Sequence, residues 1–379
     1  MPEIKTAVLF VAAALLFSTT VTAQQDKDLT LYQGGEAYEV KSFTQAFKSD
    51  KPKNVILFIG DGMGVAQVFA GLTANKGNLF LENCRYIGFS KTSAANRYVT
   101  DSAAGGTALA TGKKTYNGAI GVDTDKNPVK NILEEAAEKG IGTGLVSTSS
   151  ITHATPASFI AHQASRSQEE DIAADFLKFD IDVFIGGGYD FFAKRKDGRN
   201  LVNELMRKGY TVEQDLTRIE NYQGKKLAGL TAPNANGRVE ERGNMLPIST
   251  KAAIDVLAQN EKGFFLMVEG SQIDWAGHAQ NTGYVVEEML DLDRAIGKAL
   301  EFAAENGETL IVVTADHETG GMTVNDGSFE TGMVKGAYTS TGHTGVMVPI
   351  FAYGPGASEF IGIMENTDLY TKIKKLLIK

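Results

Sequence analysis

Short apolar runs that end in glycine, an acid or histidine recur along the chain, and they predict buried strands. The apolar residues in them are continuous rather than alternating, which is typical of strands covered on both faces. The runs are Asn54–Gly60, Gly142–Ser147, Asp182–Gly186, Phe264–Val268, Thr309–Thr314 and Pro349–Tyr353.

Segments with helical spacing lie between these runs, with glycine or asparagine near their ends. Strands that alternate with helices predict an α/β fold, doubly wound, with a mainly parallel central sheet and helices on both faces. Ligands of such sheets bind at the carboxyl ends of the strands. The predicted helices are Asn131–Lys139, Ser167–Lys178, Leu201–Lys208, Ser249–Gln259 and Thr282–Glu305.

The N-terminus has the pattern of an export signal. Lys5 precedes the apolar run Ala7–Phe17, and Val21-Thr22-Ala23 supplies small residues for cleavage. The run is too short for a stable transmembrane helix, although a membrane anchor is the alternative interpretation. We therefore expect a signal peptide over residues 1–23 and a periplasmic or secreted mature chain with no membrane attachment.

The remaining residues, 24–379, are predicted to form one domain, because no linker, repeat or low-complexity tract divides them. The segment Lys194–Gly243 is richer in charged residues, Asn and Gly than its surroundings. We expect this segment to leave the central sheet and to carry small structure of its own.

Composition and charge narrow the function. Hydrophobic residues make up 43% and charged residues 22% of the chain, which is typical of a globular protein. The formal net charge of −9 weighs against nucleic acid as a specific partner. Cys84 is the single cysteine, which excludes an internal disulfide and a four-cysteine zinc site. Any metal must therefore be held by histidine and carboxylate groups.

Oxygen ligands and imidazoles follow several predicted strands. Because the carboxyl ends of parallel strands meet at one edge of a sheet, these side chains are expected to converge. They are Asp61, His153, Thr155, Glu269, Asp316 and His317.

Asp274 and His278 are four residues apart, a spacing that places both side chains on one face of a helical turn. With His343, which lies among glycines, they can share one zinc ion and leave a coordination position open. The alternative is an ordinary helix start with an Asp cap.

Asp316 and His317 are adjacent, so in a regular strand their side chains would point to opposite faces. At a strand end that enters a loop, both can turn toward one metal ion. Asp61 is the natural third ligand of that ion.

Ser102 lies among small residues that allow a ligand to approach the backbone closely. Asp101 resembles a helix N-cap, and the helix would run from Ser102 toward Thr111. A helix N-terminus favours phosphate, which makes Ser102 a candidate nucleophile. A plain Ser/Ala-rich helix start is the alternative, and the sequence lacks the Gly-x-Ser-x-Gly pattern of α/β-hydrolases.

Together these segments resemble the motifs of the alkaline phosphatase family, in the family's order from Asn54 to about Pro349. One such motif is moderately specific, whereas the ordered set is highly specific. The matching stretches are GDGMG at Asp61, TDSAAGGTA at Ser102, HATPASFIAHQASR ending at Arg166, VEGSQIDWAGH from Glu269 to His278, TADHETGG at Asp316, and GHTG at His343.

The resemblance implies a site with two zinc ions and one magnesium ion. Imidazole nitrogen suits zinc, and a set of oxygen ligands suits magnesium. By similarity, Ser102 is the nucleophile and Arg166 binds the phosphate. The implied ligands are Asp274, His278 and His343 for the first zinc; Asp61, Asp316 and His317 for the second; and Asp61, Thr155 and Glu269 for magnesium.

His153 and Trp275 differ from the enteric bacterial pattern, which has Asp and Lys at the corresponding places. The pair resembles forms from some marine and cold-living bacteria. It implies that His153 acts on magnesium through a water molecule. It also implies that product phosphate is bound more loosely than in a lysine form, because Trp275, next to the phosphate, has no positive charge. The short stretch between His317 and His343 implies a compact form, in which the family's homodimer is an open question.

The expected activity is hydrolysis of small phosphate monoesters through a phosphoserine intermediate. The first alternative is a related phosphodiesterase or sulfatase. Arg166 and a full set of ligands for the third metal favour phosphate monoesters instead, because monoesters carry an extra negative charge. The second is a non-enzymatic phosphate- or metal-binding export protein. Ser102 speaks against that alternative, since binding alone needs no nucleophile.

Overall fold

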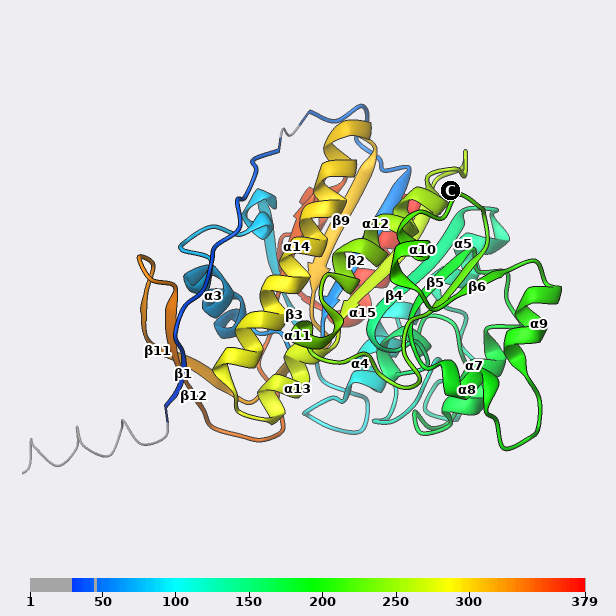
Figure 1. The fold of residues 1–379 in the computed structure, drawn as a ribbon, viewed down its shortest axis with the longest axis horizontal. Helices are drawn as coiled ribbons and strands as arrows, with labels where there is room; N and C mark the ends of the chain where they lie inside the picture. Colours follow the sequence, from blue (N-terminus) through cyan, green and yellow to red (C-terminus); the bar gives the residue numbers. More distant parts are fainter. Residues whose placement is uncertain (1–28, 44–45, 379) are drawn as a thin grey trace, which may run out of the picture.

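A ten-stranded sheet forms the centre of the computed structural model, which describes residues 29–43 and 46–378. All neighbouring strands are parallel except β14, which runs antiparallel to β3 and β9. The predicted α/β fold with a mainly parallel sheet is thus confirmed (Figure 1). The order is β15 (Gly362–Glu365), β3 (Tyr86–Lys91), β14 (Val348–Tyr353), β9 (Thr309–Thr314), β2 (Asn54–Gly60), β8 (Phe264–Gly270), β4 (Gly142–Ser150), β5 (Val183–Gly187), β7 (Leu227–Leu230) and β6 (Thr211–Glu213).

Strand β2 shows why the apolar runs form buried strands. Successive side chains point to opposite faces of a strand, so an unbroken apolar run supplies both faces. Val55, Leu57 and Ile59 enter one hydrophobic core, whereas Ile56 and Phe58 enter the other. The sheet therefore separates two cores, and each core needs a layer of helices to cover it.

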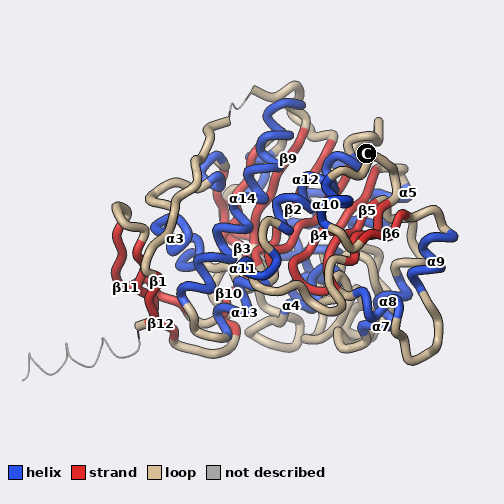
Figure 2. The backbone as a smooth tube through the Cα atoms, viewed as in Figure 1, coloured by secondary structure: helices blue, strands red, loops and turns tan. Residues whose placement is uncertain are grey.

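The helices supply these two layers (Figure 2). The layer with α12 (Met245–Leu257) and α14 (Thr282–Asn306) covers one core, and the layer with α4 (Ser102–Thr111), α5 (Ile132–Glu138) and α15 (Asn366–Leu377) covers the other. Further helices pack on one core or the other: α3 (Val65–Ala74), α6 (Ala154–Ala157), α7 (Glu169–Asp175), α8 (Tyr189–Ala193), α13 (Gln272–His278), and the 3₁₀ turns η1 (Phe80–Asn83) and η2 (Ala357–Phe360).

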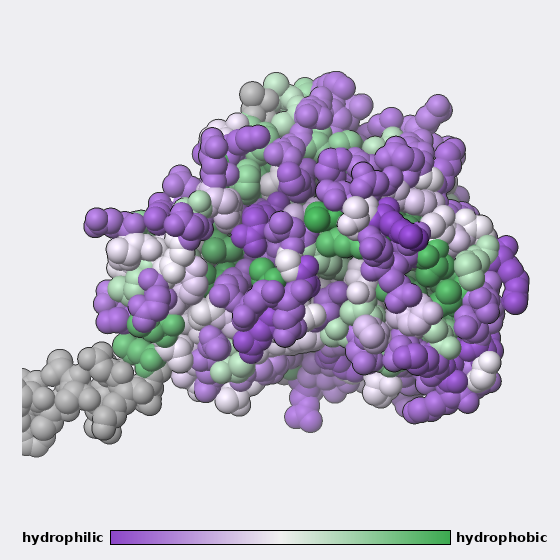
Figure 3. Space-filling model, in the orientation of Figure 1, coloured by the Kyte–Doolittle hydropathy of each residue, from purple (hydrophilic) through white to green (hydrophobic). Residues whose placement is uncertain are grey.

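Helix α14 shows how the sequence sets this packing. Val285, Met289, Leu292 and Ile296 recur at three- and four-residue intervals and are all buried in one core. A stripe of this kind leaves the opposite side of the helix polar. The face of the molecule in Figure 3 is accordingly mostly hydrophilic, with apolar residues in small separate areas.

The segment 194–243 was expected to leave the central sheet, and this expectation was wrong. It contains α9 (Leu201–Arg207), α10 (Leu216–Glu220) and α11 (Val239–Arg242), but it also contributes β6 and β7 to the sheet. All residues of β7 are buried. The strand is only four residues long and includes Gly229, so its apolar signal was too short to stand out.

Two smaller sheets lie outside the central one. The first contains β1 (Thr30–Tyr32), β12 (Met333–Tyr338) and β11 (Met322–Ser328), and Figure 1 shows it beside α3. The second pairs β10 (Glu318–Thr319) with β13 (His343–Thr344). In the ranges 29–43 and 46–378, no helix has the length and apolar character needed to cross a membrane. The predicted signal peptide, residues 1–23, lies outside the described residues.

Candidate active site

Four adjacent strands deliver the candidate ligands to one edge of the sheet. The strands β9, β2, β8 and β4 are consecutive in the sheet. Asp61 directly follows β2, Glu269 is the penultimate residue of β8, and Asp316 lies two residues beyond β9. His153 lies three residues beyond β4, at the start of α6. Residues far apart in the sequence therefore meet at the strand ends, as in other open α/β sheets.

Three groups of side chains in this area have the geometry of metal sites. Within each group, one potential ligand atom from every residue lies within 4.8 Å of the others. The groups are Asp274, His278 and His343; Asp61, Asp274 and His317; and Asp61, His153 and Glu269.

The first group converges from helix α13 and strand β13. His278 Nε2 lies 3.3 Å and His343 Nε2 lies 3.4 Å from Asp274 Oδ1, and the two Nε2 atoms are 3.2 Å apart. The other ring nitrogens face backbone carbonyls, with His278 Nδ1 at 2.6 Å from Thr341 O and His343 Nδ1 at 2.9 Å from Thr100 O. A proton on each Nδ1 would be held by the carbonyl, which leaves each Nε2 lone pair free for a metal.

The second group is buried, and it contains Asp274 in the place where the resemblance implied Asp316. His317 Nε2 lies 3.5 Å from Asp61 Oδ1 and 3.4 Å from Asp316 Oδ2. Burial lowers the pKa of His317 to about 4, so the ring is neutral near pH 7, as a metal ligand must be. Thr319 joins this group to the first, because its hydroxyl donates to Asp274 Oδ1 and lies 3.2 Å from His317 Nδ1.

The third group lies between β8 and α6. The Glu269 carboxylate accepts hydrogen bonds from the hydroxyl groups of Ser147 and Ser149, which favour its ionised form. Thr155 is fully buried on α6. The geometric cluster contains His153 in the place where the sequence pattern implied Thr155.

Among the described residues, three carboxylates of this site, those of Asp61, Glu269 and Asp316, have raised pKa values. Burial, together with the carboxylates of Asp316, Asp274 and Glu269, raises the pKa of Asp61 well above its ordinary value. Burial also raises the pKa of Glu269 to about 7 and that of Asp316 to about 6. Burial alone would raise the pKa of Asp274 as well, but the hydrogen bond with His278 and the neighbouring imidazoles outweigh it and lower that pKa.

Among the described residues, both carboxylate oxygens of Asp61 and Oδ2 of Asp316 are buried without a hydrogen-bond partner. Such atoms are costly to bury unless something pairs with them. Bound cations supply that compensation, and the mixed imidazole and carboxylate donors fit divalent ions. The residues present therefore fit a metal cluster.

Ser102 occupies the predicted place at the start of helix α4, 2% exposed. Its Oγ lies 3.3 Å from His317 Nε2, so the hydroxyl borders the second group. Asp101 is the N-cap of α4, since its Oδ1 accepts a hydrogen bond of 2.9 Å from the Ala104 N–H. The hydroxyl thus lies at a helix N-terminus and beside a ligand cluster, an arrangement suited to a phosphate group.

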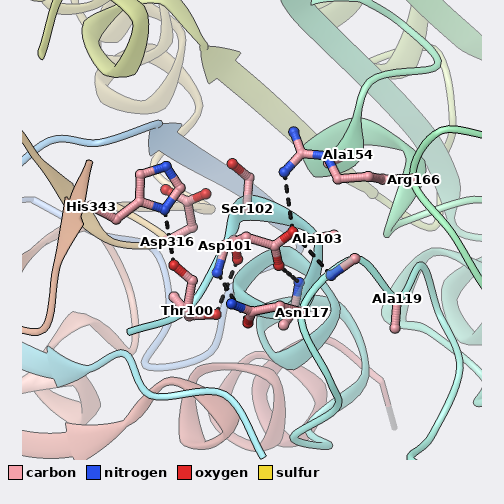
Figure 4. A network of polar contacts seen from close by, with 12 residues as sticks. Thr100, Asp101, Ser102, Ala103, Asn117, Ala119, Ala154, Arg166, Asp316 and His343 are labelled. Atoms are coloured by element: carbon pink, nitrogen blue, oxygen red, sulfur yellow. Dashed lines mark hydrogen bonds and ion pairs between the residues drawn. The ribbon is translucent and has the colours of Figure 1, made fainter. Parts of the chain in front are cut away.

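Arg166 reaches the same place from the loop that precedes α7 (Figure 4). Its Nη1 lies 3.2 Å from Asp101 Oδ2, and its Nη2 lies 3.1 Å from His153 Nε2. The side chain is 30% exposed, so the guanidinium is open to solvent on one side. Asp101 Oδ2 also accepts from the Gly118 N–H at 3.0 Å, which fixes the carboxylate that orients Arg166.

The structure also shows residues that sequence reasoning missed. Asp101 was identified as a helix cap but not as the anchor of Arg166, because no local spacing links positions so far apart in the chain. Glu318 and Thr319 were also missed. They immediately follow the Asp316-His317 pair, and this closeness in the sequence was the one indication that they could contact the site.

The sequence is similar to known alkaline phosphatases. A family model for alkaline phosphatase matches residues 52–337. Alkaline phosphatase 4 of Bacillus subtilis (strain 168) is 36% identical, with 92% of this chain and 94% of that protein covered. The alkaline phosphatase of Escherichia coli (strain K12) is 34% identical, with 87% of each chain covered.

The structure is similar to solved alkaline phosphatases as well. The enzyme from the Antarctic bacterium TAB5 superposes with a TM-score of 0.81 at 43% identity, covering 86% of this chain and 98% of that one. A cold-active enzyme from a Shewanella species gives 0.79 at 33% identity, covering 86% and 100%. The fold, the family model and the relatives agree, and this chain belongs to the alkaline phosphatase family of metal-dependent phosphate-monoester hydrolases.

Proposed function

We propose that this chain hydrolyses phosphate monoesters through a phosphoserine intermediate on Ser102, at a site for two zinc ions and one magnesium ion. The observation that carries the proposal is the position of Ser102 Oγ, 3.3 Å from His317 Nε2 and at the N-terminus of α4. The alternatives of a plain helix start or a binding protein give no reason for a buried hydroxyl beside uncompensated carboxylates.

The ligand assignment follows the family resemblance; the geometric groups agree with it except that they contain Asp274 in place of Asp316 and His153 in place of Thr155. Asp274, His278 and His343 would hold one zinc ion, and Asp61, Asp316 and His317 the other. Asp61, Thr155 and Glu269 would hold magnesium, with His153 acting through a water molecule. Variants of the TAB5 enzyme in which a histidine is replaced by Glu or Asp have been solved with magnesium bound in the M3 site, which supports a third metal site in this fold. When bound, the ions would supply Lewis acidity that favours ionised hydroxyl groups and stabilises a departing oxygen.

The residues of the chain perform the chemistry in two steps. Ser102 Oγ forms a bond to phosphorus while the ester P–O bond opposite to it breaks, and the alcohol leaves. Water then attacks the same phosphorus and releases phosphate, which restores the Ser102 hydroxyl. Arg166, already oriented by Asp101, binds two phosphate oxygens as a fork, which stabilises the charge during both steps.

The test is Ser102→Ala, assayed as kcat/KM on p-nitrophenyl phosphate. We expect a loss of about 10³-fold or more, because the nucleophile is removed while the binding groups stay. Ser249→Ala is the matched control: Ser249 is fully buried on α12 and its hydroxyl has no hydrogen-bond partner among the described residues, so kcat/KM should not change.

Two outcomes would reject the proposal. Unchanged turnover of Ser102→Ala would exclude the phosphoserine route. Faster hydrolysis by the unmodified protein of the corresponding phosphodiester or sulfate ester would instead favour a related phosphodiesterase or sulfatase.

A further inference from the structure

Glu318 is a buried acid beside the site that has no place in the mechanism. It lies on β10 directly after His317 and is 4% exposed. Its carboxylate accepts hydrogen bonds from Gln67 Nε2 at 2.8 Å, Met322 N at 3.1 Å and Gly321 N at 3.2 Å, and also from the Thr344 hydroxyl. Among the described residues, no lysine, arginine or histidine forms an ion pair with it, so four donors alone compensate the buried charge.

The Thr344 bond connects Glu318 to a metal-binding histidine. In the β10–β13 pair, Glu318 lies opposite Thr344 and Thr319 lies opposite His343. This ladder is only two residue pairs long, and so short a ribbon has little stability of its own. The hydrogen bond from the Thr344 hydroxyl to Glu318 therefore helps to fix the backbone of β13, which positions His343.

The Gln67 bond connects Glu318 to the loop that follows Asp61. Gln67 Oε1 accepts from the Gly64 N–H at 3.1 Å, and its Nε2 donates to Thr319 O at 3.0 Å as well as to Glu318. Gly64 packs so closely on Glu318 that a Cβ atom there would lie 2.5 Å from Glu318 Cγ. The missing side chain at position 64 thus allows the loop after Asp61 to lie directly against this carboxylate.

The chemistry of the donors explains why an acid is needed. The four groups that bond to Glu318 all act as donors. Oε1 accepts from Gln67 and Met322, and Oε2 accepts from Gly321 and Thr344. A glutamine of the same shape would turn its NH₂ group toward one pair of donors. At least one backbone or amide N–H would then lose its acceptor inside the protein.

We propose that Glu318 is a positioning residue that fixes His343 relative to Asp61 and thereby sets the zinc affinity of the Asp274–His278–His343 group. It touches neither substrate nor metal and acts through Thr344 and Gln67. The inference rests on the proposed function, because it takes that group to be a zinc site.

The test compares Glu318→Gln with the unmodified full-length mature protein. The probe is zinc alone, titrated into chelator-treated protein against a chromophoric competing chelator. We expect one of the two zinc dissociation constants to rise about 10-fold in Glu318→Gln, the lower end of what outer partners of metal ligands contribute. Thr344→Val should give a similar rise and Thr344→Ser should restore tight binding, because only the latter keeps the hydroxyl.

Asp293→Asn separates positioning from general loss of stability. Asp293 is also a fully buried acid with three hydrogen-bond donors, but these belong to Tyr38, Phe80 and Leu81, none of which is a candidate ligand. This variant should unfold at lower temperature and bind zinc as tightly as the unmodified protein.

Each remaining outcome has a distinct meaning. Zinc binding that is equally tight in Glu318→Gln and the unmodified protein would overturn the positioning assignment. Equal weakening in Asp293→Asn would also overturn it, since the effect would then follow stability. Failure of the unmodified protein to bind zinc tightly would instead contradict the proposed function.

Discussion

Trp275 lies on α13, next to the proposed zinc ligand Asp274, and partly covers His153. The two rings meet edge to face, with centroids 6.2 Å apart and an interplanar angle of 84°. His153 in turn lies 3.1 Å from Arg166 Nη2, so Trp275 borders the guanidinium side of the site. A neutral, bulky side chain at this position supplies no positive charge to an anion.

Replacing Trp275 by lysine should tighten the binding of product phosphate. The added ammonium would face a phosphate group at a half-exposed position, so we expect the inhibition constant for inorganic phosphate to fall about 10-fold. Trp275→Met, which is neutral and flexible, is the control for the loss of the ring. If Trp275→Lys is inhibited no more strongly than Trp275→Met, Trp275 does not set phosphate affinity.

At the residue scale, the sequence contained most of the candidate site. Asp61 could be selected because it follows a strand, and His343 because it lies among glycines. Ser102 could be selected because it starts a helix among small residues, and Asp274 by its four-residue spacing from His278. Arg166 came from the family resemblance alone, since its loop has no pattern that indicates a phosphate ligand. The positioning contacts of Asp101, Thr319 and Glu318 depend on long-range packing, which no local spacing encodes.

At the scale of elements, Asp293 shows how α14 holds its neighbours. Its carboxylate accepts from the Phe80 N–H at 2.8 Å and the Leu81 N–H at 2.9 Å, both on η1. It also accepts from the Tyr38 hydroxyl at 2.6 Å, and the Tyr38 ring stacks on Phe80 with centroids 5.8 Å apart. One buried acid therefore connects the segment 29–43 and η1 to the long helix.

Asp293 should make the free energy of unfolding depend on pH. Burial raises its pKa from 3.8 to about 6, so the folded chain binds the proton more tightly than the unfolded chain. The resulting stabilisation is fully present below pH 3.8 and is lost as the pH rises to about 6. The loss amounts to about 3 kcal/mol at 1.36 kcal/mol per pH unit.

Urea unfolding of the unmodified protein and of Asp293→Asn between pH 3.5 and 7.5 measures this effect. Asparagine cannot titrate, so the difference in unfolding free energy between the two proteins isolates Asp293. As the pH rises from 3.8 to about 6, the unfolding free energy of the unmodified protein should fall relative to that of Asp293→Asn. A difference that stays constant over this range would show that Asp293 does not titrate as proposed.

The elements themselves were predictable to different degrees. β2 and β9 have the predicted bounds, because their apolar runs are continuous and sharply ended. Helix α12 begins at Met245 rather than Ser249, since Pro247 fits the first helical turn, where its missing N–H costs nothing. β3 and β15 lie toward one edge and mix exposed with buried residues, and β6 is three residues long, so none of them gave a clear apolar run.

At the scale of the whole molecule, the charge distribution opposes the proposed substrate unless cations are bound. The chain carries a formal net charge of −9, and the site itself contains four buried acids, Asp61, Glu269, Asp274 and Asp316. Arg166, which pairs with Asp101 next to Ser102, is the one arginine or lysine labelled in the network of Figure 4. A phosphate dianion would be repelled by such a site, whereas three divalent ions would reverse its sign.

The dependence of activity on bound metals is tested most directly by two measurements, made before and after chelation. They are elemental analysis of the purified protein and its rate of p-nitrophenyl phosphate hydrolysis. The account predicts about two zinc ions and one magnesium ion per chain, loss of nearly all activity when they are removed, and recovery when both metals are restored. Ser102→Ala should keep the metals and lack the activity. Full hydrolysis by protein from which the metals have been removed would contradict the account.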